Sequence, residues 1–339
     1  MKDASEREGI RWKNGLAIAS TLFEYGISIS LLIQPLWILK LVGVILLTHS
    51  FVWSAVLTHE FIHGTIFKAR SLNAGFGRLM THLNGACYAP YEDIVQHHFN
   101  HHIYHVDLVP FDSPTYFKRL PSPIRRLFVA LEWVYFPVFE FVMRSRLILA
   151  PFQGVGQSLE QSSGRSRLRW RTLFLLTYRC ALLGLLGWVS WSGLLLYGIS
   201  YICFVNLMRF ADAFHHTYDY VVTGEPIPTR DRAYEDANTF SNLVSINHPW
   251  LNLLYLNFGY HNAHHHDMRC PWYALPDLHR RLYGSQSKAI IPLSQLILNY
   301  HQFRIERLFG GQSAAPSEAH PPALADLIGG VGVSFLTPP

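Results

Sequence analysis

Histidine is the residue type in this sequence whose spacing most clearly indicates chemistry. Nineteen of the 339 residues are histidine, and three short clusters stand out among them. Residues three or four positions apart share one face of a helix, so each cluster directs its imidazoles to one side. Imidazole binds Zn, Cu, Ni and Fe, and the pattern therefore predicts a metal site. The clusters read H-E-F-I-H, H-F-N-H-H and H-N-A-H-H, and they contain His59, His63, His98, His101, His102, His261, His264 and His265.

Isolated histidine pairs at this spacing are often solvated or capping residues, and His-rich surface tracts also occur. Here all three clusters lie beside apolar segments, where eight uncoordinated imidazoles would be costly. One metal ion cannot use eight imidazoles, so the clusters predict two ions. Tetrahedral zinc takes three or four ligands, whereas two irons of higher coordination number accommodate eight or nine nitrogen atoms. Iron is therefore the expected metal.

The first cluster also satisfies the H-E-x-x-H pattern of zinc proteases, with Glu60 as the general base. That alternative needs one further Asp, Glu or His ligand and leaves the other six clustered histidines unexplained. A metal transporter is a third class, but its ligands would line a path across the membrane. The clusters are instead expected on one side of it.

The elements that position these histidines are predicted to be membrane helices. Half of the residues are hydrophobic and only 15% are charged, against about 25% in soluble proteins. Four apolar runs are long enough, at about 1.5 Å per residue, to cross about 30 Å of hydrocarbon. Only a few residues separate the first run from the second and the third from the fourth, which predicts two helical hairpins. The runs cover residues 15–34, 36–57, 173–191 and 194–208.

We therefore expect an all-α integral membrane protein: four transmembrane helices in two hairpins, with a cytosolic helical cap that carries the histidines. Four spans place both termini and the long middle segment on one side. Of the 28 Lys and Arg residues, all but Lys40, Arg179 and Arg209 lie outside the spans on that side, which predicts that it is cytoplasmic. Residues 124–150 mix apolar and charged side chains and predict a helix in the membrane interface, with a fifth span as the alternative.

The expected domain organisation has three parts. Residues 1–14 are polar and form a cytosolic N-terminal flank, with no pattern of a secretory signal. Residues 15–310 form the membrane domain. Residues 311–339 begin with a segment rich in Gly, Ala, Ser and Pro and predict a disordered C-terminal tail.

The three clusters, in this order, resemble the histidine boxes of the integral-membrane fatty acid desaturase family, whose relatives include acyl hydroxylases and carotenoid ketolases. The resemblance covers about residues 15–310 and includes N-F-G-Y-H-N-A-H-H-H-D-M-R-C-P-W-Y around the third box. It implies two Fe ions, O2 as co-substrate, and a fatty acyl lipid into which a C=C bond is introduced. Hydroxylation or ketolation within the same superfamily is the alternative reaction.

Members of this family often have a further ligand between the fourth span and the third box. The segment F-A-D-A-F-H-H-T-Y-D offers His216, with His215 as its competitor, and similarity to the family pattern favours His216. His97, His105 and His266 are expected to lie outside the ligand set. The resemblance thus implies the ligands His59, His63, His98, His101, His102, His216, His261, His264 and His265.

Acidic residues near the boxes are candidates to orient these imidazoles, because a metal-bound histidine usually donates its other N–H to a carboxylate or a carbonyl. For each of them a solvated position at a helix end is an equally good interpretation. Within the spans, Glu24 and Arg179 would be costly unless paired, and they could pair with each other. The candidate acids are Glu60, Asp107, Asp212, Asp219 and Asp267.

The implied reaction needs electrons that this chain does not supply. It has no H-P-G-G haem segment, no four-cysteine iron–sulfur pattern and no Gly-rich dinucleotide fingerprint. An external donor is therefore implied: a ferredoxin, a rubredoxin or cytochrome b5, with its NAD(P)H reductase. The net charge of +5 comes without a basic arm or repeat, so membrane lipids rather than nucleic acid are the expected partners.

Overall fold

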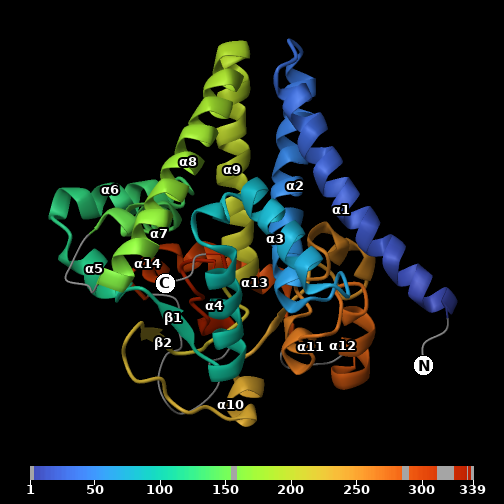
Figure 1. Ribbon diagram of the computed structural model, residues 1–339. Helices are drawn as coiled ribbons and strands as arrows, with labels where there is room; N and C mark the ends of the chain where they lie inside the picture. The colour runs from blue at the N-terminus through green and yellow to red at the C-terminus, as the bar shows by residue number, and fades with distance from the viewer. Residues whose placement is uncertain (1–3, 154–158, 285–289, 311–323, 334, 337–339) are drawn as a thin grey trace.

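The computed structural model describes residues 4–153, 159–284, 290–310, 324–333 and 335–336, and it is mostly helical (Figure 1). Its four longest helices are α1 (Ala4–Leu32), α2 (Trp37–His63), α8 (Leu159–Val189) and α9 (Trp191–Asp212). Each contains a stretch long and apolar enough to cross a membrane. The prediction of an all-α membrane protein with four spans is confirmed.

The long helices pack in sequential pairs whose turns lie at the same end of the molecule (Figure 1). Gly43 of α2 lies close against Leu31 and Leu32 of α1, where a larger residue would be crowded. The turn between α8 and α9 is capped by Ser190, whose hydroxyl accepts from the Gly193 N–H at 3.0 Å. The two turns are linked because Lys40 Nζ donates to Ser192 Oγ at 2.6 Å.

Helix α2 extends from the membrane-spanning region into the cap. Its 27 residues extend for about 40 Å at about 1.5 Å per residue, which exceeds the about 30 Å of the hydrocarbon layer. The helix is therefore long enough for its last turns, with His59 and His63, to project beyond that layer. The helix ends at Gly64, whose φ of 69° is the left-handed conformation typical of helix C-caps.

The remaining elements form a helical cap at the end opposite the two turns (Figure 1). Two short parallel ladders join distant segments of this cap: β1 (Asp107–Val109) pairs with β2 (Tyr220–Val222), and β3 (Ser241–Asn242) pairs with β4 (Ile290–Ile291). The helices are α3 (Arg70–Asn84), η1 (Ala86–Tyr88), α4 (Tyr91–Tyr104), α5 (Ser113–Arg119), α6 (Ser122–Trp133), α7 (Val138–Leu149), η2 (Ala150–Phe152), α10 (Arg232–Ala237), η3 (Pro249–Tyr255), α11 (His261–His266), α12 (Leu275–Tyr283), α13 (Leu293–Gln302), α14 (Arg304–Gly310) and η4 (Leu324–Asp326).

The segment predicted to be one interfacial helix, residues 124–150, is divided between α6 and α7. The break lies at residues 134–137, where Tyr135 has a φ of 59° and Pro137 precedes α7. Neither helix is among the four candidate spans found in the described part of the chain. A fifth span is therefore not supported.

The prediction of a disordered tail over residues 311–339 is wrong for the part that the structure describes. Leu327, Val331, Val333, Phe335 and Leu336 are all buried. The small and proline-rich residues that motivated the prediction are followed by an apolar stretch, which can be packed into a core. Residues 311–323, 334 and 337–339 lie outside the described residues.

The suggested pairing of Glu24 with Arg179 is also wrong. Glu24 Oε2 instead lies 2.7 Å from His49 Nδ1 of the adjacent helix α2. The Arg179 guanidinium donates to the carbonyl of His82 at 3.1 Å and contacts the Cys87 sulfur at 3.2 Å. Each charged group is satisfied by a nearer polar partner.

Candidate metal centre

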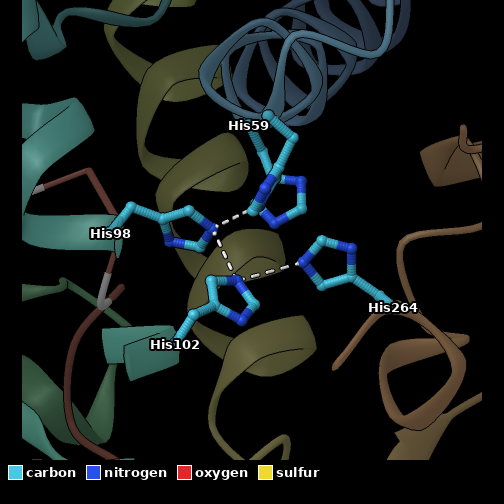
Figure 2. Close-up of side chains that lie close together, drawn as sticks. His59, His98, His102 and His264 are labelled. Carbon is cyan, nitrogen blue, oxygen red and sulfur yellow. Dashed lines mark hydrogen bonds between the residues drawn. The ribbon is translucent and has the colours of Figure 1, made fainter. Parts of the chain in front are cut away.

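The nine histidines implied as ligands lie at the cap end of α2, and the fold gathers them into two groups. Within each group, one ligand nitrogen from every histidine lies within 4.8 Å of those of the others. Figure 2 shows four members of the first group converging from three separate segments. The first group consists of His59, His63, His98, His102 and His264, and the second of His101, His216, His261 and His265.

Helix α4 contributes to both groups. His98 and His102, four residues apart, have their Nε2 atoms 3.1 Å from each other in the first group. His101 belongs to the second group, where its Nε2 lies 3.1 Å from that of His216. The adjacent residues His101 and His102 thus belong to different groups, whereas His98 and His102, one turn apart, share a group.

Helix α11 is divided in the same way. His264 Nε2 lies 3.2 Å from that of His102 in the first group (Figure 2). His261 Nε2 lies 2.7 Å from that of His216 in the second, which His265 also joins. The third box therefore faces both groups at once.

His216, rather than His215, joins the second group. It follows the end of α9 and forms an isolated antiparallel bridge with Thr239, whose hydroxyl lies 3.3 Å from His216 Nδ1. The His215 ring is fully buried, stacks on His261 with the ring centroids 4.0 Å apart, and has Nδ1 3.5 Å from Asp212 Oδ1. His215 thus packs against His261 and is not itself a member of the second group.

The chemistry of these histidines fits a bound metal. All but the partly exposed His63 are buried, and among the described residues His59 Nε2 and His265 Nε2 have no hydrogen-bond partner. Burial, reinforced by neighbouring imidazoles, lowers the pKa of His102 and His261 well below the ordinary value. Neutral imidazoles whose nitrogen atoms converge in a buried site are in the form that binds metal.

Two carboxylates contact ligand imidazoles at Nδ1, the ring nitrogen opposite Nε2. Asp107 Oδ1 lies 2.9 Å from His101 Nδ1, as predicted for one of the candidate acids. Its position follows from the turn after α4, where His105 has a φ of 53° and leads the chain into β1. Glu235 Oε1 lies 2.9 Å from His265 Nδ1. Such contacts fix the orientation of a ligand imidazole and leave Nε2 for the metal.

The sequence did not indicate Glu235. It lies on α10, capped by Asp231, whose side chain accepts from the Tyr234 N–H at 2.9 Å. Nothing in its spacing connects it to the third box, 30 residues further along the chain. The sequence offered one indication of its role: Glu235 is an acidic residue on a short capped helix between the fourth span and the third box.

The other predicted acids have different roles. Glu60 Oε1 is 3.6 Å from His59 Nδ1, longer than a hydrogen bond. Asp219 pairs with Arg230, and Asp267 accepts from the backbone N–H of Arg269 at 3.0 Å. For Asp219 and Asp267 the alternative interpretation of a solvated position fits, because both are exposed and have partners outside both groups.

The protease alternative is not supported by the position of Glu60. Its Oε2 accepts from the Thr65 hydroxyl at 2.7 Å and from the Trp272 N–H at 3.1 Å, and the side chain is buried. A general base needs access to a water molecule, whereas this carboxylate ties the end of α2 to the segment after α11. His59 and His63 meet three further histidines rather than a single additional ligand.

The three adjacent histidines lie outside both groups, as expected. His105 Nε2 lies 3.5 Å from Glu235 Oε2, and His266 Nδ1 lies 3.3 Å from the Arg232 guanidinium. His97 is buried on α4.

Four apolar helices with two groups of buried imidazoles at one end define a multi-pass membrane protein able to hold metal. The sequence model of the fatty acid desaturase family matches residues 35–295, which is more than half of the chain and includes all nine histidines. The chain therefore belongs to the fatty acid desaturase family, as its histidine boxes predicted. No curated protein and no solved structure matched it. The family makes this a desaturase-type oxidoreductase that acts on lipid in a membrane.

Proposed function

We propose that the protein is a membrane-bound, O2-dependent fatty acyl desaturase with two Fe ions held by histidine. The main support for this proposal is that the nine imidazoles form one group of five and one group of four. Five ligands exceed the three or four of tetrahedral zinc, and two neighbouring groups suit a pair of ions of higher coordination number. The family match is the independent support.

The nine histidines are assigned as the metal ligands, five to one iron and four to the other. Asp107 and Glu235 keep two of them in the tautomer that presents Nε2 to the metal. When bound, the irons supply the oxidising chemistry that removes one hydrogen from each of two adjacent carbons. O2 is reduced to two water molecules with these two hydrogens, two protons and two external electrons.

The surroundings of the site favour a hydrocarbon substrate. The Phe258 and Phe335 rings pack on His59, with centroids 5.2 and 5.6 Å from its ring. A cavity of about 460 Å³ between α2 and α9 is lined almost entirely by apolar side chains. Tyr255 lines this cavity and packs against Phe258, whose ring contacts His59. Apolar side chains both in this cavity and against His59 suit a hydrocarbon chain.

The water-exposed side of the cap is assigned to the cytoplasm, where an external donor delivers electrons. A second cavity, of about 820 Å³, is lined by His63 together with Lys68, Arg70 and Arg269. These basic groups suit an acidic donor such as a ferredoxin, a rubredoxin or cytochrome b5. On this proposal residues 15–310 are the desaturase domain and residues 1–14 its cytosolic flank.

Metal analysis and lipid profiling test the proposal together. Protein purified in detergent is expected to contain about two irons per chain, and cells that express it should contain a new unsaturated acyl species. His264→Ala should abolish the product, whereas His266→Ala, one residue outside the groups, should retain it. One zinc per chain with unchanged lipids would overturn the proposal. Two irons with a hydroxylated or ketolated product would keep the centre and replace the reaction.

A further inference from the structure

The described part of the C-terminal segment, residues 324–333 and 335–336, runs through the interior of the cap (Figure 1). Buried polar side chains from three helices bind its backbone. Asn299 Nδ2 donates to the Leu327 carbonyl at 3.1 Å, and Arg307 Nε to the Ile328 carbonyl at 3.0 Å. Arg209 Nε donates to the Val331 carbonyl at 2.9 Å.

A carboxylate completes this set of contacts. Glu140 Oε1 accepts from the Val333 N–H at 2.7 Å. The Gly330 N–H donates to the Ala213 carbonyl at 2.6 Å, and the chain approaches this carbonyl at Gly329, whose φ of 82° favours glycine. Hydrogen bonds to buried charged groups are expensive to break, because the charge is left without a partner. The segment is therefore a fixed part of the fold.

This anchoring places one aromatic side chain at the metal centre. Phe335 is 2% exposed, and its ring centroid lies 5.6 Å from that of His59 and 6.3 Å from that of His98. It also packs on Phe258 at 5.5 Å. Phe335 and Phe258 together form an apolar wall against the first histidine group. Val333 and Leu336 continue the same core toward α2 and α9.

We propose that Phe335 is a specificity-determining residue, which fixes the section of an acyl chain that can lie against the metal centre. The inference rests on the proposed function. A carbon that reacts must lie against the histidine groups, and the Phe335 ring covers the first group beside His59 and His98. The hydrogen bonds that anchor the segment keep the Phe335 ring from moving away. An acyl chain displaced by one methylene group therefore contacts this wall at a different carbon. Apolar pockets discriminate about tenfold or more per methylene.

Variants of different size at this position test the proposal. Phe335→Ala and Phe335→Leu should change the wild-type product into a mixture of positional isomers, with the new isomer reaching about a tenth or more of the product. Phe117→Ala, a matched truncation of a buried ring in a separate core, should leave the distribution unchanged. A wild-type distribution from both Phe335 variants, at normal iron content, would overturn the proposal.

A second readout does not depend on turnover. Cells that express the protein can be fed a saturated fatty acid with a mid-chain diazirine, irradiated, and the purified protein digested. The crosslinked acyl chain is expected on the peptides that contain Phe335 and Phe258, and its absence from both would contradict the inference. If the wild type yields an oxygenated product, the proposed function fails, yet the position of the oxygenated carbon and the crosslinks still test the role of Phe335.

Discussion

His265 Nδ1 and Glu235 Oε1 lie 2.9 Å apart, in a contact that joins the third histidine box to α10. The same carboxylate receives the Arg232 guanidinium at 2.9 Å. Burial raises the pKa of Glu235, and Arg232 opposes this effect. The carboxylate is thus held by one permanent cation while it orients the imidazole.

Glu235→Gln should weaken iron binding by roughly 10–100-fold, the usual effect of losing a carboxylate behind a ligand histidine. Asp236→Asn is the matched control, because Asp236 also pairs with Arg232 but is exposed and contacts no ligand. Iron titration of the metal-free protein checks the prediction. Equal affinities for the two variants would show that Glu235 does not support the site.

His101→Ala and His264→Ala remove one ligand from each group and should each reduce turnover to background. Neither side chain faces lipid, so membrane insertion should be unchanged. His266→Ala provides the control from the same helix as His264. Product analysis with a membrane-fractionation assay checks both parts, and full activity in either ligand variant would refute its assignment.

Removal of metal should lower the thermal stability of the protein. A metal that binds only the native state adds about 4 kcal/mol when present at about a thousandfold over its dissociation constant. Without it, converging lone pairs of buried imidazoles face one another. Chelation should lower the unfolding temperature in detergent, and Fe(II) should restore it. The doubly substituted His101→Ala, His264→Ala protein should show little dependence on the chelator.

Glu132→Ala should destabilise the cap by about 3–5 kcal/mol, because it leaves the buried Arg209 charge without its carboxylate. The two groups are 2.7 Å apart and both are almost fully buried. The exposed Arg78–Glu92 pair offers a comparison: Glu92→Ala should cost about 0–1 kcal/mol. Denaturant unfolding of the two variants measures the difference, and equal losses would contradict the role given to burial.

Gly259→Ala should distort the start of the third box. An added Cβ would collide with the Asn242 backbone and the Tyr255 hydroxyl, so the chain before His261 would have to move. Lower iron content and a lower unfolding temperature are expected. Gly75→Ala on α3, where the Cβ meets open space, should leave both unchanged.

The sequence predicted the histidines and the spans because both depend on local periodicity. Spacing of three and four residues places side chains on one helix face, but it does not reveal that His98 and His101 serve different groups. That division depends on how α4, α11 and the end of α9 meet in three dimensions.

Contacts between distant segments also could not be predicted from the sequence. Glu235 reaches His265 through tertiary packing, and neither residue has a local signal for the other. The C-terminal segment was misjudged because the composition of its first residues indicated disorder. Its burial depends on acceptors and donors from Glu140, Arg209 and Arg307, which are far away in the chain.

Because α4 and α11 each supply ligands to both groups, neither helix can shift without disturbing two sites together. Adjacent residues on each helix, His101 and His102 on α4 and His264 and His265 on α11, belong to different groups, so the backbone of these two helices fixes how the groups lie relative to each other. Loading of one site orders the framework of the other. Iron uptake should therefore be cooperative, with singly loaded protein scarce at every stage of a titration.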